Sequence, residues 1–299
     1  MSGGLFGSQS RFSVADRSSF NPARRLQGEL VSRVRGVFND RAKGEQPVIR
    51  SDNALFPRNS VIWRVHGDVT SMMVGGMAAL LLQMLHPAAL TAVLDHSNFR
   101  SDMLGRLRRT AKFIALTTYG DRIQAEAAID RVRSIHAQVT GTLADGTPYR
   151  ADDPRLLAWV HTAEALCFLD AWIAYGEPTM SVRDQNQYFV EAAVVARRLG
   201  ADPVPLTRSA ALAFVAEMRP ALRATPDCLE VAQLIVAPKA PNLGALAVQR
   251  LLAHAAIDLL PGWTRDMLKL GRPGPDALLT ATATKGMAAT LRWAFSGQR

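Results

Sequence analysis

Residues 154–175 read PRLLAWVHTAEALCFLDAWIAY, and apolar side chains occupy most of this stretch. Asp152 or Asp153 precedes it as a helix N-cap. Pro154 suits the first helical position, where a backbone N–H would have no partner. A helix that is apolar nearly all round is buried inside a protein. We therefore expect residues 154–175 to form a core helix.

On both sides of this stretch, apolar residues recur with the period of a helix. Further helices are expected over residues 23–38, 69–86, 102–119, 121–141, 181–199, 207–218, 226–235, 244–259, 261–270 and 275–295. Pro87 must end or kink the helix that begins near Val69. No run of alternating polar and apolar residues indicates a strand. The sequence therefore predicts an all-α fold, a single helical domain.

The N-terminal part of the chain differs from the rest. Residues 1–20 are rich in Ser and Gly, which predicts a mobile segment, and an amphipathic helix follows it. We expect residues 1–48 to hold these two parts and residues 49–299 to form the helical domain. Residues 40–60 read as a loop, because Gly, Pro, Asp and Asn occur there without periodicity.

Composition narrows the class of protein. The chain has 299 residues, 48% of them hydrophobic, which is enough for a sizeable core. Its net charge of +9 is diffuse, and its basic clusters are not interleaved with aromatic residues, so we expect no nucleic-acid partner. No pattern indicates an oligomeric state.

Two features bear on location. The N-terminus lacks the pattern of a secretory signal, and the two cysteines are too few for a disulfide framework, so we expect a soluble cytoplasmic protein. Residues 72–94 approach the length of a membrane span, but they include Gln83, His86 and Pro87. We expect a helix buried in protein, and binding to a membrane surface is the less favoured alternative.

His136 is the first candidate for chemistry. Ile129, Val132, His136 and Val139 fall on one narrow stripe of the predicted helix, so the imidazole should point inward. An inward histidine on a rigid helix is what an axial haem ligand requires. The same position also suits an ordinary core histidine. Helical spacing alone leaves both interpretations open.

The preceding helix offers a second group. Arg106, Thr110, Phe113 and Thr117 share a stripe, and an Arg with hydroxyls beside a Phe could bind a haem propionate or iron-bound oxygen. The alternative is a solvated basic turn formed by Arg106, Arg108 and Arg109.

The other histidines are secondary candidates. His86 ends an apolar helix before Pro87, and Asp95 and His96 follow; no paired ExxH spacing supports a zinc or di-iron centre. His161 and Glu164 lie one turn apart in the core helix, where a carboxylate needs a partner. Glu164 could orient a ligating histidine, balance a buried Arg, or form a structural pair with His161.

Five segments taken together resemble a known family. They are LFPRNSVIWRVHGD (55–68), LLLQMLHPAALTAVLDHSNFR (80–100), GRLRRTAKF (105–113), RVRSIHAQVTG (131–141) and DPRLLAWVHTAEALCFLDAW (153–172). In order and spacing they resemble the oxygenase MpaB family, which also provides the catalytic core of latex-clearing rubber oxygenases. The resemblance covers residues 50–290 approximately.

The resemblance implies an all-helical protein with a globin-like core that binds haem b and uses dioxygen. It implies that His136 is the proximal iron ligand, with Arg106 and Thr110 near the distal face. Where the rubber enzymes have a distal lysine, this chain has Arg109, which cannot deprotonate. We therefore expect a haem-dependent oxidation of a small hydrophobic substrate rather than rubber cleavage. The alternative is a haem-binding or hydrophobic-ligand-binding protein without turnover.

Overall fold

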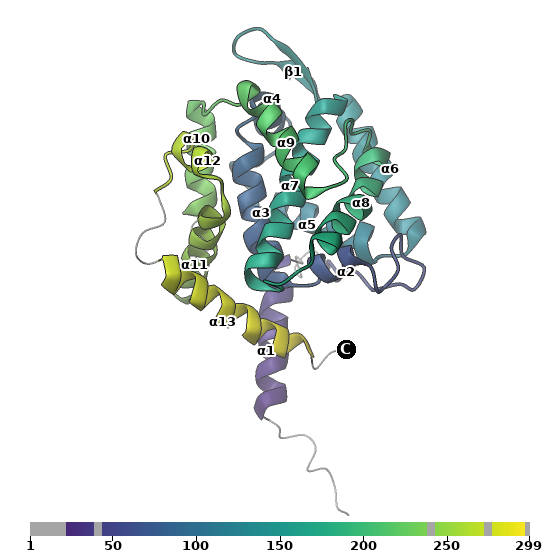
Figure 1. Cartoon of the computed structure of the whole chain (residues 1–299), viewed down its shortest axis with the longest axis vertical. Helices are drawn as coiled ribbons and strands as arrows, with labels where there is room; N and C mark the ends of the chain where they lie inside the picture. The colour runs from purple at the N-terminus through teal and green to yellow at the C-terminus, as the bar shows by residue number, and fades with distance from the viewer. Residues whose placement is uncertain (1–21, 39–43, 238–242, 272–276, 297–299) are drawn as a thin grey trace, which may run out of the picture.

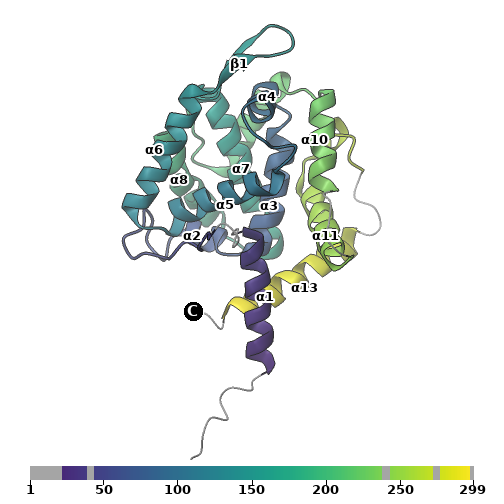
Figure 2. The same ribbon diagram turned by 180° about the vertical axis from the view of Figure 1, so that it is seen from behind.

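A computed structural model describes residues 22–38, 44–237, 243–271 and 277–296 (Figures 1 and 2). Across these ranges, the regular structure is helical apart from one small hairpin, which confirms the all-α single domain. The globin-like arrangement stays a prediction. The helices are α1 (Pro22–Phe38), α2 (Val61–His66), α3 (Val69–Gln83), α4 (Pro87–Asp95), α5 (Met103–Tyr119), α6 (Arg122–Gln138), α7 (Pro154–Tyr175), α8 (Val182–Leu199), α9 (Arg208–Met218), α10 (Pro226–Val236), α11 (Leu243–Leu259), α12 (Gly262–Met267) and α13 (Ala277–Ser296), with a 3-10 turn at Arg219–Ala221.

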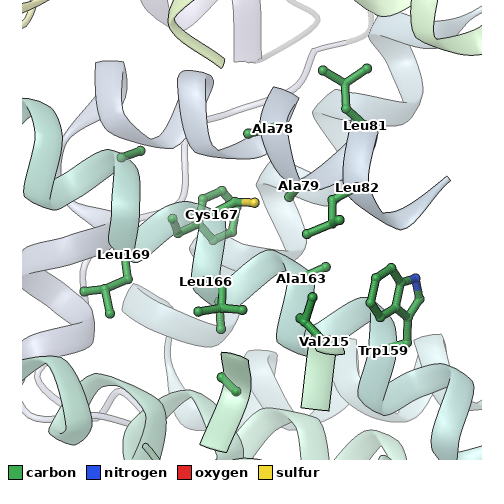
Figure 3. Close-up of a cluster of buried hydrophobic side chains, with 14 of the residues drawn as sticks. Ala78, Ala79, Leu81, Leu82, Trp159, Ala163, Leu166, Cys167, Leu169 and Val215 are labelled. Atoms are coloured by element: carbon green, nitrogen blue, oxygen red, sulfur yellow. The ribbon is translucent and has the colours of Figure 1, made fainter. Parts of the chain in front are cut away.

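The core is built around α7, with the bounds that the sequence predicts. Asp153 caps it by accepting a hydrogen bond from the Leu156 N–H at 2.8 Å. Helix α3 packs along its length, and apolar side chains of the two helices meet in the core (Figure 3). The Trp159 Nε1–H donates to the Gln83 carbonyl at 3.2 Å, and Gln83 Nε2 donates to the Val160 carbonyl at 2.9 Å. These bonds fix the register of α3 against α7.

Pro87 separates two helices, as the sequence predicts. Helices α3 and α4 meet at an angle of 105°. By length and composition α7 could cross a membrane, and so could α3 and α4 if they are taken as one span. In α7, 67% of the apolar window is buried inside the protein, as in the core helix of a globular domain.

Two local predictions need correction. The helix expected over 121–141 ends at Gln138, and the polar turn that follows is framed by a hairpin of β1 (Thr140–Thr142) and β2 (Pro148–Arg150). The sequence predicts no helix between residues 60 and 69, where the structure has the short helix α2. Strands of three residues and a helix of six are too short to show a period in the sequence.

The two ends of the described chain pack together. Helix α1 confirms the amphipathic helix expected there, with Val31 buried, and it lies against α13 and α5. Gln27 Nε2 donates to the Trp293 carbonyl at 3.1 Å, and Arg108 donates to the Gly36 carbonyl at 3.0 Å. The mobile segment predicted over residues 1–20 lies outside the described residues.

Candidate functional site

His136 lies on the inner face of α6, as its spacing predicts. Ile129 is buried and His136 is half-buried, whereas Arg131 and Arg133 are exposed. The helix begins after Asp121, whose side chain accepts a hydrogen bond from the Ile123 N–H at 3.0 Å. This cap fixes where α6 starts.

The imidazole of His136 is neutral and unpaired. Its Nδ1 atom is enclosed by protein without a hydrogen-bond partner, and none of the described residues bonds to the ring. Burial lowers the pKa of His136, and the positive charge of Arg106 lowers it further. The negative charge of Asp152 raises it in part. A neutral imidazole with a free nitrogen can ligate a metal, whereas an imidazolium cannot.

Arg106 lies on α5, which packs directly on α6. Asp102 caps α5 by accepting a hydrogen bond from the Gly105 N–H at 2.9 Å. Arg106 is half-buried, and burial lowers its pKa, followed by the charge of Arg109. Within the described ranges no carboxylate pairs with it. A neutral histidine and an unpaired cation are thus neighbours on two packed helices.

Arg109 and Thr110 lie in a different environment. Both side chains are exposed; Arg109 is 3.7 Å from Asp102 in an ion pair and donates to Asn98 Oδ1 at 3.4 Å. The solvated-turn interpretation therefore describes Arg109 but not Arg106. Lower on the same stripe, Thr117 is buried and donates to the Phe113 carbonyl of its own helix at 3.0 Å.

His86 and His96 lie in different environments. His86 is half-buried at the start of α4, with an enclosed and unpaired Nδ1 and its ring 6.5 Å from that of Trp159. Burial lowers its pKa, and Asp153 opposes this. His96 is exposed and donates to the Thr140 carbonyl at 3.1 Å. Among the described residues no three His, Cys, Asp or Glu side chains gather as a metal site.

His161 and Glu164 lie on the same face of α7, as predicted, but without the partners that we expected. The His161 Nε2 atom is enclosed and unpaired, and burial lowers the pKa of this residue to about 4. Glu164 makes no hydrogen bond or ion pair with a described residue, and burial raises its pKa to about 7. Neither a balancing Arg nor a His161–Glu164 hydrogen bond is present in the described part of the chain.

Sequence reasoning missed His66. It ends α2, with Nδ1 2.9 Å from Thr118 Oγ1 of α5 and Nε2 3.0 Å from the Tyr188 hydroxyl of α8. Burial lowers its pKa to about 3. Both ring nitrogens are therefore satisfied in a neutral imidazole. The only sequence signal for His66 was its place in residues 55–68, one of the segments that resemble the family. Its hydrogen-bond partners lie far away in the sequence.

Comparison with known families decides the class of the protein. A family model described as "ER-bound oxygenase mpaB/B'/Rubber oxygenase, catalytic domain" matches residues 63–293. The chain belongs to this family. The match confirms the resemblance, and this oxygenase catalytic domain contains every candidate residue discussed above. No curated protein and no solved structure matches the chain.

Proposed function

We propose that this chain is a haem b-dependent oxygenase and that His136 is the iron ligand. The observation that carries the proposal is the adjacency of His136 and Arg106 in the oxygenase domain, a neutral unpaired imidazole beside an unpaired half-buried guanidinium. A haem needs only one proximal ligand from the protein. The described residues therefore fit haem better than an ion held by protein ligands alone.

Each of the two residues would have a distinct task. His136 would offer a neutral nitrogen from a rigid helix, with burial keeping the proton off the ring. Arg106 would bind a haem propionate or lie on the distal side, since its planar donors suit carboxylate and oxygen acceptors. When bound, haem b would supply the iron that activates dioxygen for the oxidation.

The proposed substrate is a small hydrophobic molecule. The core around α3 and α7 is apolar, and half-buried methionines at positions 72, 73 and 77 line one side of α3. Methionine side chains adapt to apolar ligands of varied shape. Arg109 supports an activity other than rubber cleavage, because it stands where the rubber enzymes have a distal lysine and its guanidinium pairs with Asp102.

An absorption spectrum of full-length protein produced with added haem tests the iron ligand. We expect a Soret band in the wild type and its loss or large reduction in His136→Ala. His96→Ala is the matched control, because His96 is an exposed histidine at the C-terminal end of α4. The Soret band of this variant should be unchanged. Circular dichroism verifies that each variant is folded. An unchanged band in folded His136→Ala would rule out the proposal.

Oxygen uptake separates the two functions left open by the sequence. With a reductant and hydrophobic substrates, an oxygenase consumes dioxygen, and His136→Ala should abolish the consumption. A stable haem band without any oxygen consumption would instead favour a haem-binding protein without turnover.

A further inference from the structure

His161 and Glu164 belong to one face of α7 that also contains Leu157 and Phe168, because these residues recur every three or four positions. The Phe168 ring lies 5.6 Å from the ring of His66 on α2. At the other end, Leu157 lies beside Gly200, which follows α8. At the Phe168 end this face meets α2 and, at Gly75, α3, whereas at the Leu157 end it meets the residue that follows α8.

The surroundings place that face on the same side of the core as the candidate haem site. Figure 1 shows α7 between α3 on one side and α8 with α6 on the other. Helix α6, which carries His136, packs on α8, where Arg198 pairs with Glu126. His66 joins α5 to α8 through Thr118 and Tyr188. The two polar groups of α7 thus belong to a face that contacts α2 and α8, and these two helices pack on α5 and α6.

These two side chains are costly to leave unpaired. A buried polar group without a hydrogen bond destabilises a fold, and a buried carboxyl does so strongly unless it is protonated. Glu164 keeps some accessible surface, yet burial raises its pKa to about 7. A carboxyl facing bulk water would keep its ordinary pKa. The accessible part of the Glu164 side chain, which has no partner among the described residues, is where a ligand can reach it.

We propose that His161 and Glu164 form a recognition site for one uncharged hydroxyl or carbonyl group of the hydrophobic substrate. The inference rests on the proposed function, because it names a substrate class for that site. A neutral imidazole and a protonated carboxyl each have a donor and an acceptor. Together they can satisfy a hydroxyl completely, whereas a hydrocarbon would leave both unpaired.

Charge argues against an anionic group at this position. No cation among the described residues accompanies the pair, and an ionised Glu164 would repel a carboxylate or phosphate. The unpaired Arg106 is the group that suits an anion, and it lies on α5. The recognition pair therefore selects a neutral oxygen function, and a site of this kind discriminates strongly against the analogue that lacks it.

Calorimetric titration of the haem-supplied full-length protein tests the proposal with two probes, geraniol, a C10 isoprenoid alcohol, and myrcene, a C10 isoprenoid hydrocarbon. We expect the wild type to bind the alcohol at least about tenfold more tightly. Glu164→Leu should remove that preference. Glu164→Gln should retain most of it, because an amide also donates and accepts. A wild type that does not prefer the alcohol overturns the proposal.

Thermal unfolding of the ligand-free protein provides a second readout. If Glu164 is unpaired until a ligand arrives, Glu164→Leu should raise the unfolding midpoint. The control is Glu191→Leu, since Glu191 is half-buried on α8 but accepts from the Ile62 N–H at 2.7 Å and from Gln187. Glu191→Leu should lower the midpoint and leave the alcohol preference intact. A lower midpoint in Glu164→Leu would indicate an internal structural role and overturn the proposal.

Failure of this inference is distinguishable from failure of the proposed function. The Soret band and its dependence on His136 test haem ligation alone. The preference for alcohol over hydrocarbon tests only the polar pair on α7. A normal haem band without alcohol preference removes the recognition site and leaves the oxygenase proposal intact.

Discussion

At the scale of single residues, burial alone does not mark a ligating histidine. Burial lowers the pKa of His66, His86, His136 and His161, so all four are neutral near pH 7. They differ in hydrogen bonding. Both nitrogens of His66 have partners, whereas each of the others has an enclosed nitrogen without one. An unpaired nitrogen is therefore the feature that separates candidate ligands from a structural histidine.

The pH dependence of stability should report Glu164. Its carboxyl ionises near pH 4.5 when the chain is unfolded but near pH 7 in the fold, so ionisation destabilises the fold as the pH rises between these values. His161 acts oppositely, losing stability as the pH falls from 6.5 toward 4. Comparison with Glu164→Gln isolates the carboxyl. Urea unfolding should show a stability gain for this variant that grows from pH 5 to pH 8; a constant difference would contradict the raised pKa.

At the scale of elements, the contact between α3 and α7 depends on a glycine. A Cβ atom at Gly75 would lie 2.8 Å from the Cys167 carbonyl oxygen and 2.9 Å from the Phe168 Cα. Both are backbone atoms of α7, which cannot move aside cheaply. Gly75 thus sets how closely the two core helices approach. At the next residue, Gly76, the nearest atom to an added Cβ is Phe168 Cε1 at 3.7 Å, an ordinary contact.

Adjacent alanine substitutions test this packing. Gly75→Ala should destabilise the protein by about 1–3 kcal/mol, because the helices must separate. Gly76→Ala should be neutral or stabilising by up to about 1 kcal/mol, because alanine favours the helix and meets no clash. The free energies of unfolding in urea measure both. Equal effects of the two substitutions would show that close approach at Gly75 is unimportant.

At the scale of the whole molecule, the C-terminal helix is tied to the start of α3. Asp68 is buried, caps α3 by accepting from the Ser71 N–H at 2.8 Å, and pairs with Arg292 of α13 at 2.8 Å. Figure 2 shows α13 crossing α1 at one end of the domain. The Asp68 carboxylate therefore both caps the core helix α3 and binds α13 through an ion pair.

Removal of the cation should loosen this end of the domain. Arg292→Ala leaves the Asp68 carboxylate buried without its cation, so we expect the free energy of unfolding to fall by about 2 kcal/mol. The loss is smaller than for a fully enclosed ion pair, because Arg292 is partly exposed. Hydrogen exchange should accelerate in α13 first. Arg133→Ala, which breaks an exposed pair with Asp130, should change stability by less than about 1 kcal/mol. Similar losses in both variants would contradict a special role for Asp68.

The sequence by itself determined the helical class, the core helix after Asp153, the break at Pro87, the inward position of His136 and the family. These features depend on local signals, namely caps, proline geometry and a period of 3.6 residues. Only the tertiary structure decided which polar groups have partners. It joined His66 to Thr118 and Tyr188 and left His161 and Glu164 unpaired on one face of α7. Such pairing depends on how helices that are distant in the sequence pack together. The spacing of residues within one helix carries no information about that packing.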